Sequence, residues 1–491
     1  MLELDKLTIH KAHELLSKKE ITSEGLTKAL LKRIEEMDGK IKAYVTLNSE
    51  EALERSSEID KKGDFTEDLS GIPVAVKDNI CTKDLRTTCA SKMLENFVPP
   101  YDATVIKKLK EKNALILGKT NLDEFDMGSS TESSYFFTSK NPWNLERVPG
   151  GSSSAAAVAA DLAIYSLDSD TGGAVRQSAA YCGVVGLKPT YGRVSRFGLA
   201  GNAGSMDTIG PITKDVKDCA IVLNAISGMD LFDPSSSDTI VPDYLESLKT
   251  NLQNVKIGIP KEFLGDAVNK DIKNAILNAA KTFEDMGFIC EETSLPNVEY
   301  ALWVHYVIAS AEASSEMCQY DGVRFGHRAQ HYENLKDLYK KSRGEGFGLE
   351  VKKRTILGTY LLDLEGNDKY LVKAYKLRTL IKQDFEKAFE KYDFLITPTT
   401  PTVAFKIGEA KDSLNVNDMC TVPVNLAGLP AISIPCGFAE GLPIGLQIIG
   451  KAFDEAGILQ VAYALTKYRL SQKTDCLEGG IRNELRNNRR S

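Results

Sequence analysis

The stretch Ser169-Asp170-Thr171-Gly172-Gly173-Ala174-Val175-Arg176 places a pair of glycines directly before a segment with helical character. A Gly-Gly turn at the start of a helix gathers backbone N–H groups, which can bind an oxyanion. Thr171, Gly172 and Gly173 are therefore predicted to form an oxyanion hole. The alternative interpretation is an ordinary turn between a loop and a helix.

Two other stretches come earlier in the chain. The apolar run 72–76 ends in Lys77, and Pro149-Gly150-Gly151-Ser152-Ser153-Ser154 follows later. Taken alone, a lysine after a strand is usually a surface charge, and a serine cluster after glycines is usually a loop. A buried lysine can instead serve as a neutral base, because burial lowers its pKa.

In this order, the three stretches resemble the amidase signature family, whose enzymes cleave amides with a Ser–cisSer–Lys triad. By this resemblance Lys77 is the base and Ser152 is the serine that shuttles the proton. Ala174 occupies the position of the nucleophilic serine. Alanine cannot be acylated, and loss of a serine nucleophile can cost about 10⁶ in turnover. The resemblance thus predicts an amidase whose activity is lost or severely reduced.

Several residues depart from the family pattern around these motifs. The run after Ser153 lacks the family's internal Gly-Gly pair, which predicts a shifted register of the loop 152–154. Ser178 lies one helical turn beyond Ala174, but the turn amides would be aimed at position 174, so we do not expect a substitute nucleophile. At four positions the family usually has Ala, Gly, Gly and Pro. This chain has, in the same order, Asp126, Asp161, Asp168 and Ser178.

Further motifs resemble the tRNA-dependent amidotransferase branch of the family. They include Asn141-Pro142-Trp143, Ser342-Arg343-Gly344-Glu345-Gly346-Phe347-Gly348 and Pro423-Val424-Asn425-Leu426-Ala427-Gly428-Leu429-Pro430. The A subunits of this branch hydrolyse glutamine, and the ammonia serves to convert Glu-tRNA(Gln) to Gln-tRNA(Gln). By the same resemblance Arg354 and Asp418 hold the carboxylate and the ammonium group of glutamine.

The resemblance also implies the partners. We expect a heterotrimer with B and C subunits, with tRNA reached through the B subunit, and with ATP and Mg²⁺ used by the partner subunit. No metal or cofactor is expected on this chain. Two alternatives remain: a catalytically inactive scaffold or glutamine-binding subunit, and an amidase for another small amide.

Composition narrows the class of protein. The chain has 491 residues, 42% of them hydrophobic, and a formal net charge of −7, which argues against this chain as the main contact with nucleic acid. The acidic N-terminus does not resemble a secretory signal, and no run approaches the ~18 apolar residues of a membrane span. We therefore expect a cytoplasmic protein without membrane contact.

Alternating strand and helix patterns predict an α/β fold, with a mixed central β-sheet surrounded by α-helices. Thr22 is a candidate N-cap for a helix ended by Gly39. The Gly-rich segments 184–195 and 204–212 are predicted to be loops. Predicted strands are 72–76, 114–118, 255–260, 394–398, 431–435 and 444–449, and predicted helices include 103–112, 155–161, 268–287, 300–320 and 365–392.

We expect one amidase signature domain over residues 1–491, because no repeat or Ser/Pro-rich linker divides the chain. Its expected parts are a helical layer at about 1–65, a catalytic core at about 66–230, a peripheral helical segment at about 261–392, C-terminal strands at about 393–475 and a polar tail at 477–491.

Overall fold

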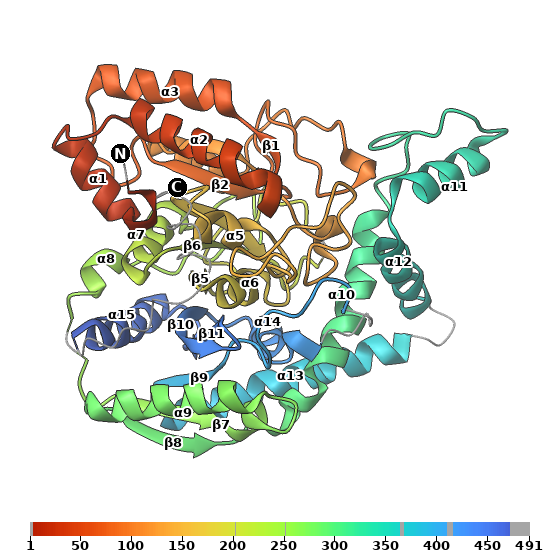
Figure 1. The fold of residues 1–491 in the computed structure, drawn as a ribbon. Coiled ribbons are helices and arrows are strands. Elements are labelled where there is room, and N and C mark those ends of the chain that lie inside the picture. Colours follow the sequence, from red (N-terminus) through yellow and green to blue (C-terminus); the bar gives the residue numbers. More distant parts are fainter. Residues whose placement is uncertain (1–2, 202, 251, 364–367, 410–415, 472–491) are drawn as a thin grey trace.

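The computed structural model describes residues 3–201, 203–250, 252–363, 368–409 and 416–471, so the predicted polar tail lies outside the described residues. One eleven-stranded mixed sheet runs through the molecule in the order β1-β3-β2-β4-β6-β5-β10-β11-β9-β7-β8 (Figure 1). The strands are β1 (Tyr44–Leu47), β2 (Pro73–Lys77), β3 (Leu115–Thr120), β4 (Tyr165–Asp170), β5 (Val185–Lys188), β6 (Thr208–Thr213), β7 (Lys256–Pro260), β8 (Ile289–Thr293), β9 (Phe394–Pro398), β10 (Ala431–Ala439) and β11 (Leu442–Ile449).

Helices surround this sheet, which confirms the predicted fold class. The α-helices are α1 (Ile9–Ser17), α2 (Ser23–Ile41), α3 (Ser49–Lys62), α4 (Thr104–Glu111), α5 (Ser154–Ala159), α6 (Ala174–Cys182), α7 (Val216–Ile226), α8 (Tyr244–Ser247), α9 (Lys270–Asp285), α10 (Ala301–Met317), α11 (Leu335–Gly346), α12 (Leu349–Leu361), α13 (Asp368–Lys391), α14 (Val422–Ala427) and α15 (Glu455–Ser471).

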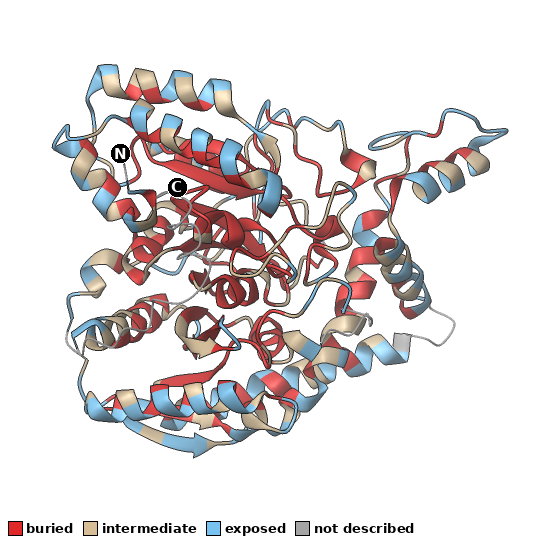
Figure 2. Ribbon diagram, in the orientation of Figure 1, coloured by how far each residue is buried: buried red, intermediate tan, exposed pale blue. Residues whose placement is uncertain are grey.

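The centre of the sheet brings the functional segments together. Strand β2 runs parallel to β4, with Val76 opposite Leu167. Their carboxyl ends therefore meet at one edge, where β2 delivers Lys77 and β4 delivers 168–170. Both strands are buried along their whole length, because helices cover the sheet (Figure 2).

Burial differs between the layers. Figure 2 shows α5 and α6 as almost wholly buried beneath the outer helices, whereas α11 projects from the body and is largely exposed. Helix α6 contacts β4, β5, β10 and β11, so the turn at its N-terminus is held against the middle of the sheet. A short helix of small residues such as α5 permits this close packing.

Most predicted elements are present, including the strand that ends at Lys77 and the antiparallel pair β10 and β11. Thr22 caps α2, as predicted, but the helix continues past Gly39 to Ile41. The predicted loops were partly wrong, because 184–195 contains β5 and 204–212 overlaps β6. Gly210 fits a strand here, since an added Cβ would lie 2.0 Å from the Leu187 carbonyl oxygen. Tertiary packing thus overrides a local preference for loops.

Strand β4 was not predicted, and β1 and β8 lie in segments that were expected to be helical. The sequence of β4 is Tyr-Ser-Leu-Asp-Ser-Asp, whose polar residues hide its position in the core. Its Asp168 lies opposite Gly210 of β6.

Candidate active site

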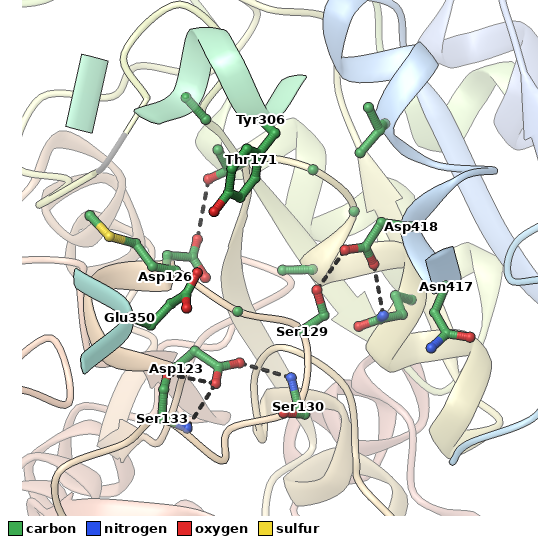
Figure 3. Close-up of a pocket in the computed structure, with 18 of the residues that line it drawn as sticks. Asp123, Asp126, Ser129, Ser130, Ser133, Thr171, Tyr306, Glu350, Asn417 and Asp418 are labelled. Atoms are coloured by element: carbon green, nitrogen blue, oxygen red, sulfur yellow. Dashed lines mark hydrogen bonds between the residues drawn. The ribbon is translucent and has the colours of Figure 1, made fainter. Parts of the chain in front are cut away.

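A cavity of about 680 Å³ opens beside the N-terminus of α6. Its wall includes the turn 171–173, Ala174, Asp126, Arg354 and Asp418. Figure 3 shows Asp126 and Thr171 on one side of the cavity, and Asp418 with Ser129 on another. The cavity therefore gathers the predicted oxyanion turn, the nucleophile position and both predicted ligand contacts.

The turn before α6 requires glycine at position 173. Gly173 has φ +139°, a region that favours glycine, and an added Cβ would lie 2.2 Å from Thr421 Oγ1. The Thr421 hydroxyl donates a hydrogen bond of 2.7 Å to the Gly172 carbonyl oxygen. Ala174 follows as the first residue of α6 and presents its methyl group to the cavity.

Arg176 fixes this turn from inside the protein. Its fully buried guanidinium binds both carboxylate oxygens of Asp170, with Nε 3.1 Å from one and an Nη 2.9 Å from the other. It also donates to Gln447 Oε1 at 2.7 Å and to the Thr421 carbonyl oxygen at 3.1 Å. The end of β4 and the start of α6 are thereby joined to α14 and β11.

Ser178 does not replace the missing nucleophile. Its hydroxyl donates a 2.6 Å hydrogen bond to the Ala174 carbonyl oxygen within the same helix. This back-bonding turns the hydroxyl toward the helix, and Ser178 is not part of the cavity wall. The expectation that Ser178 supplies no nucleophile agrees with this geometry.

Lys77 is buried at the carboxyl end of β2, as predicted, but it is not in the environment of a neutral base. Its Nζ lies 2.7 Å from Asp126 Oδ1 and 2.9 Å from Asp168 Oδ1. Burial alone would lower the pKa of Lys77, but the charges of the two carboxylates outweigh burial and raise it above the usual range. These surroundings favour the charged form of Lys77 over the predicted neutral base.

Ser152 lies on the other side of the Asp168 carboxylate from Lys77. Its hydroxyl donates to Asp168 Oδ2, while Lys77 binds Asp168 Oδ1. The described peptide bonds are all trans, so the cis bond implied by the family resemblance is absent here. The neighbouring Ser153 hydroxyl donates to the carbonyl oxygens of Ala43 and Asn121 at 2.7 and 3.0 Å. Asp168 thus stands between the two residues that a proton relay would join.

Arg354 reaches the cavity from α12. Its guanidinium stacks over the Tyr306 ring, with 4.2 Å from Cζ to the ring centroid, and its Nε lies 3.0 Å from Glu350 Oε1. Stacking and the carboxylate hold the planar group in one orientation at the cavity wall. Both Tyr306 and Glu350 also line the cavity (Figure 3).

Asp418 faces the cavity from the short 3-10 helix Val416–Asp418. Its carboxylate accepts hydrogen bonds from Ser129 Oγ at 2.6 Å and from Gln177 Nε2 at 2.9 Å. Burial raises the pKa of Asp418 to about 7 despite these bonds. The carboxylate is therefore well oriented and lacks a cationic partner in direct contact among the described residues.

Sequence reasoning missed several residues of the site. In the sequence, Asp126 and Asp168 stand out only as departures from the family pattern, and that departure is the available signal. His305 gives no signal, yet its ring lies beside Gly172, where an added Cβ would be 3.0 Å from Nε2. Burial, aided by the Arg354 charge, lowers the pKa of His305 to about 4, so its ring is neutral at pH 7.

Comparison with known proteins identifies the class of this fold and site. The family model described as Amidase matches residues 25–459. The chain belongs to the amidase family, and this confirms the predicted family, fold class and type of enzyme.

Relatives that match over nearly the whole chain share one name. The chain is 56% identical to the A subunit of glutamyl-tRNA(Gln) amidotransferase of Caldanaerobacter subterraneus subsp. tengcongensis, covering 97% of this chain and 100% of the relative. The protein of the same name from Moorella thermoacetica is 54% identical, covering 94% and 96%.

A solved structure gives the same result. The chain resembles the crystal structure of the glutamyl-tRNA(Gln) amidotransferase A subunit from Thermotoga maritima with a TM-score of 0.80 and 41% identity, covering 95% of this chain and 96% of that one.

Among the residues that the structure describes, no helix combines the length and the apolar character needed to cross a membrane.

Proposed function

We propose that this chain serves as the A subunit of a glutamyl-tRNA(Gln) amidotransferase and binds glutamine without hydrolysing it efficiently. The observation that carries the proposal is the cavity that contains Arg354 and Asp418 while presenting the Ala174 methyl group at the oxyanion turn. Recognition groups for an α-amino acid are in place, but the hydroxyl needed to form an acyl-enzyme is absent.

The two recognition residues suit the two charged ends of glutamine. The planar Arg354 guanidinium can bind a carboxylate through two parallel hydrogen bonds, and its stack on Tyr306 orients it for this contact. Asp418 can accept a charge-assisted hydrogen bond from an ammonium group. An ammonium ligand would favour the ionised form of Asp418, whose pKa is raised to about 7 by burial in the free protein.

The proposal includes the partners of the relatives. The chain would assemble with B and C subunits into a heterotrimer in the cytoplasm, and tRNA, ATP and Mg²⁺ would be bound by the partner subunits rather than here. With no efficient release of ammonia from glutamine, this complex would depend on ammonia from solution. Binding of glutamine would remain as the contribution of the cavity.

Reconstitution of the full chain with its B and C subunits tests the proposal. We expect Gln-tRNA(Gln) formation with ammonium chloride as nitrogen source, and at least about 10³-fold slower formation with glutamine. Calorimetry should detect glutamine binding, and Asp418→Asn should weaken it. Asp161→Gly is the matched control, because Asp161 pairs with Lys214 at 2.7 Å and does not line the cavity.

Other outcomes would support the alternatives. Assembly with the partners but no glutamine binding would indicate a scaffold role. Rapid release of ammonia from a different small amide would indicate an amidase of another specificity. Failure to assemble with B and C subunits would contradict the amidotransferase proposal as a whole.

A further inference from the structure

The surroundings of the Lys77 amine match its charged form. Three acceptors lie within hydrogen-bond distance of Nζ: Asp126 Oδ1 at 2.7 Å, Asp168 Oδ1 at 2.9 Å and the Ser169 carbonyl oxygen at 2.9 Å. An ammonium group has three donors and no acceptor, so these three partners match it fully. A neutral amine would present its lone pair to one of the oxygens.

The carboxylates are also satisfied on their other sides. Asp168 accepts from Ser152 Oγ and from the Ser169 backbone N–H, the latter at 2.6 Å. Asp126 Oδ2 accepts from Ser169 Oγ at 3.1 Å and Thr171 Oγ1 at 3.3 Å. Each of the four carboxylate oxygens thus has a partner, and the group is a complete hydrogen-bonded unit.

We propose that Lys77, Asp126 and Asp168 form a buried ion cluster that replaces the proton relay of the site and keeps Lys77 as an ammonium ion. The site is then disabled at two independent points. Ala174 removes the nucleophile, and the cluster removes the base that would activate a nucleophile at that position. This inference deepens the proposed function and rests on it.

The position of Ser152 supports the claim that the cluster removes the base. A relay serine must accept a proton from the nucleophile and pass its own to the lysine. Here the Ser152 hydroxyl donates to Asp168, and the Lys77 donors are all engaged by oxygen acceptors. The lysine has no lone pair to receive a proton, so a serine restored at position 174 would remain un-ionised.

Three full-length variants in complex with the partner subunits test the claim about activity. They are Ala174→Ser alone, Ala174→Ser combined with Asp126→Ala and Asp168→Gly, and Ala174→Ser combined with Asp161→Gly. The last variant is the matched control, since it also removes an aspartate that departs from the family pattern, but outside the cavity. Residue 174 is probed by fluorophosphonate labelling, located by mass spectrometry, and by ammonia release from glutamine.

We expect Ala174→Ser and its Asp161→Gly control to stay at the background rate of the unaltered chain. The variant without the two cluster carboxylates should react about 10²–10⁴-fold faster, which is the usual contribution of a general base. Equal labelling of all three variants, whether fast or absent, would overturn the proposal. Weak glutamine binding alone would count against the proposed function, because labelling with a fluorophosphonate does not need glutamine.

A thermal stability cycle provides a readout that does not depend on catalysis. Lys77→Met in the unaltered chain leaves two buried carboxylates without their cation, so we expect a melting temperature lower by roughly 3–5 °C. The same substitution in the Asp126→Ala, Asp168→Gly background should cost far less. A Lys77→Met variant that melts at or above the original temperature, or an equal loss in both backgrounds, would overturn the ion cluster.

Discussion

Replacement of Arg176 by methionine tests how the oxyanion turn is held. Methionine keeps most of the length of the side chain but removes the guanidinium that binds Asp170, Gln447 and the Thr421 carbonyl oxygen. Arg176 is fully buried, so neither water nor another cation can replace the contact at low cost. We expect a large loss of stability.

The magnitude follows from the burial of the pair. Removing one partner of a buried ion pair costs about 3–5 kcal/mol, because the other charge is left uncompensated. The entropy of unfolding is about 2.1 cal/mol/K per residue, so in a chain of 491 residues this loss lowers the melting temperature by about 3–5 °C. Arg324→Met is the matched control: Arg324 pairs with Asp321 at the surface, where a salt bridge contributes about 0–1 kcal/mol.

The pH dependence of stability provides a second test of the contact between Arg176 and Asp170. Burial opposes ionisation of Asp170, but the charge and hydrogen bonds of Arg176, aided by the Lys188 charge and a hydrogen bond from Asn425, together outweigh it and lower the pKa below its usual value. A carboxyl with a lowered pKa in the folded state contributes stability above its unfolded pKa, and this contribution is lost as pH falls. The difference between Arg176→Met and the unaltered chain should therefore shrink below about pH 4. Scanning calorimetry at about pH 7 and about pH 3 measures both effects, and a loss at pH 7 no larger than that of Arg324→Met would refute the reasoning.

Three further predictions concern the site. Asp418→Asn should weaken glutamine binding by about 10²-fold in calorimetry, because it removes the anionic contact for the ammonium group; unchanged affinity would contradict the assigned contact. Gly173→Ala should destabilise the protein and abolish glutamine binding, because the new Cβ meets Thr421 Oγ1 at 2.2 Å with φ at +139°; normal binding would show that the turn is not rigid. Asp207 accepts a 2.6 Å hydrogen bond from the hydroxyl of Thr171 in the oxyanion turn. Burial raises the pKa of Asp207 to about 7, so its contribution to stability is present at low pH and declines as pH rises from about 4 through 7. Asp207→Asn should flatten this decline in urea titrations at pH 5 and pH 8, and an unchanged slope would argue against it.

The sequence predicted the strands that are uniformly apolar and the helix with a clear cap. Strand β2 and the cap at Thr22 are local features, since their residues determine them without reference to the rest of the chain. Strands β4 and β6 are different, because their polar residues and glycines take strand geometry through pairing with each other and with β2 and β5. No pattern within either segment indicates those partners.

The site also has features that local sequence determines and features that depend on distant partners. The family resemblance predicted the site residues, and Ala174, Arg354 and Asp418 do lie together in the cavity, whereas Lys77 and Ser152 do not line it. The protonation state of Lys77 depends instead on Asp126, which is distant in sequence, and on Asp168, which lies in the strand that was not predicted. Charge state is a property of the assembled environment, and a motif that matches one residue at a time does not contain it.

The ion cluster also explains why a lysine is needed in a site without a nucleophile. Two carboxylates buried side by side repel each other and lose hydration, so a cation between them favours their ionised forms. In this structure Lys77 supplies that cation, with both carboxylates within 2.9 Å. The role of Lys77 thus shifts from accepting a proton to retaining one, and the substitutions at 126, 168 and 174 form one consistent change rather than three separate defects.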